Sequence, residues 1–189
     1  MLITFTKIVF KFLLGKLKNK IIKKISQTNY GFYFMCYFFL RNYNFKFIKK
    51  TTVDMVWGKA ICLAKINIPI NNLYGSIRVN GSTKLLKIGE TPHYSYINSD
   101  GKDQSYIEYK LNNFDHFDKS ELKKRYEYIK DLTKIEPVEI LIKKDSDLIL
   151  LNKGKIIDGL HRSAILKYNG VEFLTCLIVD RVIVNNEHK

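Results

Sequence analysis

The sequence predicts one small α/β domain behind a basic helical leader. The chain has 189 residues, which is enough for one domain with a core and too few for two ordinary domains. Short apolar runs bounded by turn-forming residues are interspersed with amphipathic stretches along residues 51–189. Apolar residues make up 46% and charged residues 26% of the chain, which excludes a disordered polyelectrolyte and a membrane protein of several spans.

Charge divides the chain near residue 51. Residues 1–50 hold 11 of the 32 Lys and Arg residues and no Asp or Glu, a net charge of +11. Residues 51–189 hold the other 21 (32 − 11) against all 18 acidic residues, a net charge of +3. The first segment also holds 13 of the 25 aromatic residues. We therefore expect a leader over 1–50 and a domain over 51–189.

Apolar residues recur at helical spacing over residues 2–25 of the leader, with lysines between them, which predicts a basic amphipathic helix. Lysines interrupt its apolar stretch and no small-residue cleavage site follows, so it is not a secretory signal. The uncharged run 30–40 is too short for a helix that crosses a bilayer, which needs roughly 20 residues. Three roles stay open: packing on the domain, docking on an anionic membrane surface, and contact with nucleic acid.

Three cysteines, Cys36, Cys62 and Cys176, are too few and too scattered for a disulfide framework. No cysteine pair or Cys/His cluster has the spacing of zinc ligands, so no structural metal is expected. Each cysteine has apolar sequence neighbours, which favours buried thiols over nucleophiles. We expect a cytoplasmic protein, peripheral to the inner membrane if the leader docks there.

The domain is expected to begin with strands. Residues 60–70 form an apolar run that ends in turn-forming residues. Residues 76–79 and 84–88 flank Asn80-Gly81, a pair typical of tight hairpin turns. These three segments predict one strand followed by a hairpin.

The middle of the domain is expected to contain loops and then a helix. Residues 90–117 are polar and weakly periodic, so we predict loops with one short helix near 106–111. Asp118 followed by Glu121 has the spacing of a capping box. The apolar residues after this pair share one helical face, and the predicted helix ends before Pro137.

The last third is expected to contain strands and one helix. The strands are predicted over 138–143, 148–151, 155–157 and 173–179, and the helix over 161–168. Gly170 follows that helix in the manner of a glycine C-cap.

The stretch 155–179 has the most informative residue pattern. An apolar strand leads into Asp158-Gly159, and His161 and Arg162 follow in the first turn of a helix. Basic side chains are unfavourable beside the positive end of the helix dipole, so their presence indicates a bound anion such as a phosphate. In the alternative, Asp158 caps the helix and pairs with Arg162, and His161 lies on the surface. The residues alone leave both interpretations open.

The order strand, turn, strand, D-G-x-H-R-x-A, then Y-x-G and an apolar strand resembles the ParB/sulfiredoxin superfamily, from about residue 88 to 179. The resemblance implies a small mixed sheet with flanking helices and a nucleotide phosphate site at the motif. Free-serine kinases of this fold carry D-G-H-H-R, which Asp158, Gly159, His161 and Arg162 match and Leu160 does not. ATP or another nucleotide and Mg²⁺ are the cofactors that this likeness implies.

Two departures from the superfamily narrow the expected activity. Leu160 stands where sulfiredoxins need a cysteine, which excludes sulfinic-acid reduction. ParB proteins place a helix-turn-helix region after this fold, whereas about ten residues follow Val179, so specific DNA binding is not expected. No paired-carboxylate metal cluster supports a nuclease.

The resemblance also implies which side chains face the ligand. A loop after an early strand faces the nucleotide in this fold, which would bring Glu90 and His93 toward the motif. Asp158, with Glu90 second, is the expected catalytic carboxylate, because phosphoryl transfer needs a group that orients the acceptor hydroxyl. The expected nucleotide-binding residues are Gly159, His161, Arg162, Ser163, His93 and Arg78. For His93 the alternative is a loop histidine that caps a turn.

The leading expectation is a nucleotide-dependent kinase of a small hydroxylated acceptor. A short basic leader on a ParB-like body resembles proteins encoded among surface-polysaccharide genes, which makes a sugar, polyol or amino acid a conceivable acceptor. The first alternative is a non-catalytic protein that binds nucleotide or nucleic acid. The second is a scaffold at a membrane surface whose pocket is empty.

Overall fold

The computed structural model describes residues 45–55, 58–79, 81–114, 118–135, 139–149 and 151–184. The helix predicted over 2–25, the aromatic run 30–40 and Cys36 lie outside these residues, so the roles open for the leader stay predictions. Strand β1 begins at Lys46 and therefore runs across the predicted boundary at residue 51.

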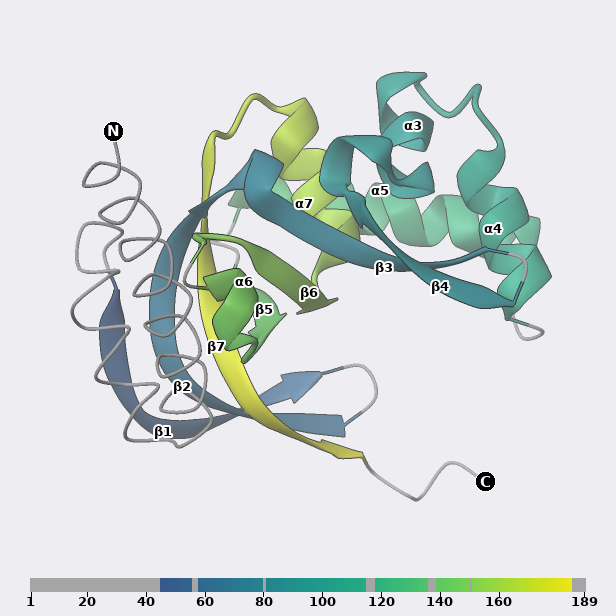
Figure 1. Cartoon of the computed structure of the whole chain (residues 1–189). Coiled ribbons are helices and arrows are strands. Elements are labelled where there is room, and N and C mark those ends of the chain that lie inside the picture. The colour runs from purple at the N-terminus through teal and green to yellow at the C-terminus, as the bar shows by residue number, and fades with distance from the viewer. Residues whose placement is uncertain are drawn as a thin grey trace, which may run out of the picture.

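The described strands form one mixed sheet of seven strands, in the order β1-β2-β7-β5-β6-β3-β4 (Figure 1). The pairs β5–β7 and β3–β6 are parallel, and the other neighbours are antiparallel. The strands are β1 (Lys46–Met55), β2 (Gly58–Pro69), β3 (Leu73–Val79), β4 (Ser82–Lys87), β5 (Ile140–Lys143), β6 (Gly154–Asp158) and β7 (Phe173–Val184). The α/β class with a mixed sheet is thereby confirmed.

Helices gather beside the β3–β4 end of this sheet, whereas β1, β2 and β7 extend away from them (Figure 1). The described helices are α3 (Pro92–Asn98), α4 (Ser105–Asn113), α5 (Lys119–Ile135), α6 (Ser146–Ile149) and α7 (Leu160–Tyr168), with short 3-10 turns η2 (Ile70–Asn72) and η3 (Ile88–Glu90). None of the helices in the described part of the chain has the length and apolar character needed to cross a bilayer.

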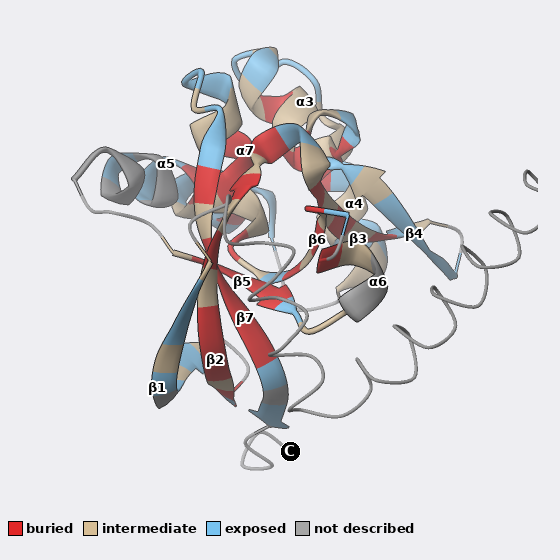
Figure 2. Cartoon of the chain, turned by 60° about the vertical axis from the view of Figure 1, so that its left-hand side comes forward, coloured by how far each residue is buried: buried red, intermediate tan, exposed pale blue. Residues whose placement is uncertain are grey.

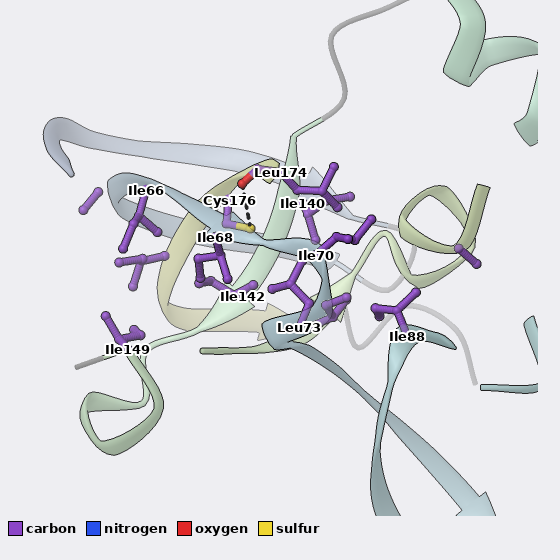
Figure 3. Packing of buried hydrophobic residues seen from close by; sticks show 14 residues of the cluster. Ile66, Ile68, Ile70, Leu73, Ile88, Ile140, Ile142, Ile149, Leu174 and Cys176 are labelled. Atoms are coloured by element: carbon purple, nitrogen blue, oxygen red, sulfur yellow. Dashed lines mark hydrogen bonds between the residues drawn. The ribbon is translucent and has the colours of Figure 1, made fainter. Parts of the chain in front are cut away.

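The sheet core is aliphatic. Every second residue of β2 from Ala60 to Ile68 has no exposed surface, as the alternation of side chains along a strand requires (Figure 2). Ile66 and Ile68 of this row pack with Leu73, Ile142 and the other core residues drawn in Figure 3. Burial of one such side chain stabilises the fold by about 1.5–3 kcal/mol. Cys62 and Cys176 are also buried, and burial raises the pKa of the Cys176 thiol to about 12.

The predicted strand over 148–151 is wrong, because Ser146–Ile149 is the short helix α6. Asp145 starts this helix: its carboxylate accepts from the Leu148 N–H at 3.2 Å, and its carbonyl accepts from the Ile149 N–H at 2.9 Å. Asn152, with φ of 53°, then turns the chain toward β6. An Asp cap thus overrides the strand preference of a short apolar run.

The prediction of loops over 90–117 is also wrong in part, because it missed helix α3. Thr91 caps this helix by accepting from the Tyr94 N–H at 3.3 Å, and Pro92 occupies its first turn. The short helix predicted near 106–111 is present as α4 and extends over Ser105–Asn113.

Other expectations are confirmed. Strands β3 and β4 form the predicted hairpin, in which Gly81 has φ of 75°. Asp118 caps α5 by accepting from the N–H groups of Ser120 at 2.7 Å and Glu121 at 2.9 Å. The predicted apolar face of this helix is buried at Leu122 and Tyr126.

Candidate functional site

Helix α7 begins directly after β6, through Gly159. This residue has φ of 95°, and a Cβ there would lie 2.8 Å from Ile140 Cδ1, so conformation and space both require glycine. No side chain caps the start of α7. The backbone N–H groups of its first turn are therefore not satisfied by a cap, as in helix starts that bind anions.

Arg162 and Asp158 form an ion pair, as expected in the interpretation of the motif without a bound anion. Arg162 Nη2 donates to Asp158 Oδ2 at 3.0 Å, and about a third of each side chain is exposed (33% and 31%). Guanidinium has five N–H donors, so this single hydrogen bond leaves donors for another acceptor. The pair is present without the cap, because Gly159 and not Asp158 holds the N-cap position.

His161 is half-buried, so its expected surface position in that alternative is wrong. Its Nε2 atom shares a 2.7 Å hydrogen bond with the Tyr106 hydroxyl of α4. Burial, followed by the charges of Lys110, Arg125 and Arg162, lowers the pKa of His161 to about 3. The imidazole is therefore neutral at pH 7, and it can offer a phosphate a hydrogen bond but no charge.

His93 lies in α3 and is buried, so the interpretation of this residue as a loop histidine is wrong. Its ring lies 4.6 Å from the His161 ring and 5.0 Å from the Tyr106 ring, between centroids. Burial, followed by electrostatic coupling to His161 and Lys110, holds the pKa of His93 well below its usual range. His93 Nδ1 is buried without a hydrogen-bond partner among the described residues, which is rare for a polar atom.

Two cations near His161 were not identified from the sequence. The positive charges of Lys110 of α4 and Arg125 of α5 both lower the pKa of His161. Burial and Arg125 lower the pKa of Lys110 itself to about 8. Lys110 Nζ lies 4.7 Å from the centroid of the Phe114 ring. A helix assigned over 105–113 would have put Lys110 one turn from Tyr106, on the same face.

Among the described residues, no hydrogen bond or ion pair joins Glu90 to Asp158. The Glu90 carboxylate accepts from the Lys87 N–H at 3.2 Å, within the local turn η3. A Cβ on the adjacent Gly89 would lie 2.9 Å from Lys167 Cε, which belongs to the last turn of α7. Helix α7 has nine residues and rises about 1.5 Å per residue. Asp158 precedes its first turn, at the end opposite Lys167.

Ser163 is fully buried, and its hydroxyl donates to the Gly159 carbonyl at 2.9 Å. In this arrangement the side chain supports the first turn of α7 and has no exposed surface for a ligand. The α7 start therefore brings together Asp158, Gly159, His161 and Arg162. His93 packs against the His161 ring.

Arg78 lies on β3, exposed, at the side of a separate cleft of about 420 Å³ between the β3–β4 hairpin and α4. The α7 start adjoins the same strand, because a Cβ on Gly75 of β3 would lie 2.7 Å from Leu160 Cδ1. Arg78 is thus three residues along β3 from the residue that contacts α7.

The described residues contain no group of three or more His, Cys, Asp or Glu side chains that could hold a metal ion. Mg²⁺ is commonly held by one or two carboxylates, water and the phosphates of a nucleotide. Of the motif residues, Asp158 alone has a carboxylate for such a role.

Comparisons with protein-family models, with curated proteins and with solved structures find no match to this chain.

Proposed function

We propose that the chain binds a nucleotide through its phosphates at the start of α7 and transfers a phosphate to a small hydroxylated acceptor. The proposal includes the ParB/sulfiredoxin type of fold suggested by the motif. The observation that carries it is a helix start with a glycine N-cap, no side-chain cap and an arginine in its first turn.

The charges around this helix start support an anionic ligand. Arg162, Lys110 and Arg125 all act on the same half-buried imidazole. Burial, with the like charge of Arg125 as the second cause, lowers the pKa of Lys110. A phosphate among them would relieve that repulsion and accept charge-assisted hydrogen bonds from Arg162 and from backbone N–H groups.

Asp158 is the carboxylate proposed to act on the acceptor. When a phosphate engages Arg162, the carboxylate is released from its ion pair and can accept the proton of an acceptor hydroxyl. The acceptor oxygen then forms a bond to the terminal phosphorus, the bond from that phosphorus to the bridging oxygen breaks, and the nucleoside diphosphate leaves. Mg²⁺, bound mainly by the phosphates, would supply charge neutralisation in this reaction.

His161 and His93 are proposed to support the site in neutral form. The Tyr106 hydrogen bond fixes the His161 ring beside the first turn of α7. His93, with an unpartnered Nδ1 atom, packs against that ring. Both rings can therefore offer or accept hydrogen bonds without adding charge to an already cationic site.

A thermal-shift screen with ATP, ADP and CTP, each with Mg²⁺, tests nucleotide binding. A ligand that binds only the folded state raises its stability by RT ln(1 + [L]/Kd), about 2.7 kcal/mol at 100 times Kd. Stabilisation together with phosphate transfer to a member of a sugar, polyol and amino acid panel is the expected result. Stabilisation without transfer to any acceptor would favour the non-catalytic alternative, and no stabilisation by any nucleotide would contradict the proposal.

A further inference from the structure

A cleft lies between the β3–β4 hairpin and α4. It has a volume of about 420 Å³. Clefts of roughly 300–1,000 Å³ are typical of sites for small organic ligands. Its volume is larger than a small acceptor alone requires, and the residues of the proposed phosphate site do not line it.

Residues that line the cleft adjoin residues that contact the α7 start. Pro92 lines the cleft, and the next residue, His93, contacts the His161 ring. Tyr109 also lines the cleft, and its ring centroid lies 5.7 Å from that of His93. On β3, Gly75 contacts Leu160 of α7, and Ile77, two residues or about 6.6 Å further along the strand, lines the cleft.

The lining combines an apolar wall with separate polar groups. Ile77, Val79 and Pro92 are apolar, and Tyr109 is half-buried. Glu108, Asn112 and Asn113 of α4 supply a carboxylate and two amides. Amides both donate and accept, and a carboxylate accepts from hydroxyl groups.

One polar atom of this lining lacks a partner. The hydroxyl oxygen of Ser105, at the start of α4, is buried and has no hydrogen-bond partner among the described residues. An unsatisfied buried hydroxyl costs about as much as a lost hydrogen bond.

We infer that this cleft binds the sugar and base of the nucleotide whose phosphates lie at the α7 start. The inference rests on the proposed function. The apolar wall suits one face of a planar base, the asparagine amides match the donors and acceptors of its edge, and Glu108 can accept from sugar hydroxyls. The cleft begins beside the phosphate site, as a nucleoside bonded to those phosphates requires.

Calorimetric titration of the full chain with ATP and with inorganic tripolyphosphate tests this inference. Asn112→Trp places a large ring in the cleft, and Asn98→Trp is its matched control, because Asn98 is an exposed residue of α3 outside the cleft. We expect Asn112→Trp to weaken ATP binding at least 10-fold and to leave tripolyphosphate binding unchanged. The control should change neither affinity.

Smaller variants keep the test independent of folding. Asn112→Ala and Glu108→Gln should each weaken ATP about 2- to 10-fold, the range for loss of one hydrogen bond, with tripolyphosphate unaffected. Arg162→Ala should weaken both ligands.

Three results would overturn the inference. If ATP and tripolyphosphate bind equally well and the cleft variants weaken neither, the phosphate site stands and the nucleoside lies elsewhere. If the cleft variants raise the KM of a sugar acceptor without changing ATP affinity, the cleft is the acceptor site. If neither ATP nor tripolyphosphate binds, the proposed function fails together with the inference.

Discussion

The domain has two interiors of different chemistry. The sheet core, formed mainly by β2, β5, β7 and their neighbours, consists of aliphatic side chains and small residues. The helical core, between α3, α4, α5 and α7, contains Tyr96, Tyr106 and Tyr126 with His93 and His161 against them.

Two hydroxyl groups of the helical core are hydrogen-bonded, whereas one ring nitrogen is not. The Tyr106 hydroxyl bonds His161, and the Tyr126 hydroxyl donates to the His93 carbonyl at 2.8 Å, whereas His93 Nδ1 has no partner in the described residues. Buried polar groups cost stability unless they are bonded, so an aliphatic interior would be the simpler solution here too. The sheet core stabilises the fold, and the helical core adjoins the α7 start at which we propose the phosphate site.

The largest expected effect lies in the sheet core. Ile66 has no exposed surface, so Ile66→Ala should lower the free energy of unfolding by about 2–5 kcal/mol, through lost burial and the cavity left behind. Urea denaturation measures this change, and nucleotide affinity of the folded fraction should not change. Ile183→Ala, at a position 45% exposed on β7, is the control. An equal loss at both positions would contradict the assignment of the core.

Arg162→Ala should have the opposite effect: a large loss of nucleotide affinity and a small loss of stability. Loss of a charge-assisted contact of about 1.5–3 kcal/mol would weaken nucleotide binding about 10- to 150-fold. Its ion pair with Asp158 is a third exposed, so stability should fall by about 1 kcal/mol or less. Lys143→Ala, which removes an exposed cation from β5, should leave affinity unchanged. Unchanged affinity with a clear loss of stability in Arg162→Ala would show that the arginine serves only its ion pair.

The helical core should also make stability depend on pH. The pKa of His161 is about 3 in the folded chain and about 6.5 in the unfolded chain, so the unfolded chain binds the extra proton between these values. The stability contributed by the neutral ring is present above pH 6.5 and falls with pH by up to about 1.4 kcal/mol per unit. His93 acts in the same direction. The loss of unfolding free energy between pH 7 and pH 5, measured by urea denaturation, should be smaller for His161→Gln than for the wild-type chain. An identical loss in the two proteins would contradict the neutral state of His161.

The smallest effect is expected from one hydroxyl. Tyr106→Phe removes the hydrogen bond to His161 and should cost about 0.5–1.5 kcal/mol of stability. Tyr128→Phe, at a residue 65% exposed on α5, should change stability by no more than about 0.5 kcal/mol. Thermal denaturation of both variants provides the comparison, and equal melting temperatures would show that the Tyr106 hydroxyl has no structural role.

The parts that sequence patterns predicted well are those governed by local chemistry. Asn80-Gly81 signals the hairpin, Asp118 caps α5, and Asp158-Gly159 ends β6 and leads into α7. The missed features depend on contacts far apart in the chain. Residues 90–117 are polar in composition, yet His93 is buried because Tyr106, Tyr109 and His161 pack around it. No spacing rule brings Arg125 to a helix that begins thirty-five residues later.

The two predicted catalytic carboxylates also differ in their place in the structure. Asp158 adjoins the α7 start, whereas Glu90 belongs to a turn beside the opposite end of that helix. Sequence order alone could not distinguish them, because both follow apolar strands.

Acceptor-dependent phosphate transfer by Asp158→Asn and Glu90→Gln is the most direct test of the proposed site. Each amide preserves the shape of the side chain and removes its charge. We predict that Asp158→Asn lowers turnover by about 10²- to 10⁴-fold, the usual contribution of a general base, with nucleotide affinity within a few-fold of wild type. Glu90→Gln should retain turnover. Full turnover in Asp158→Asn would contradict the assignment of the phosphate-transfer site to the start of α7.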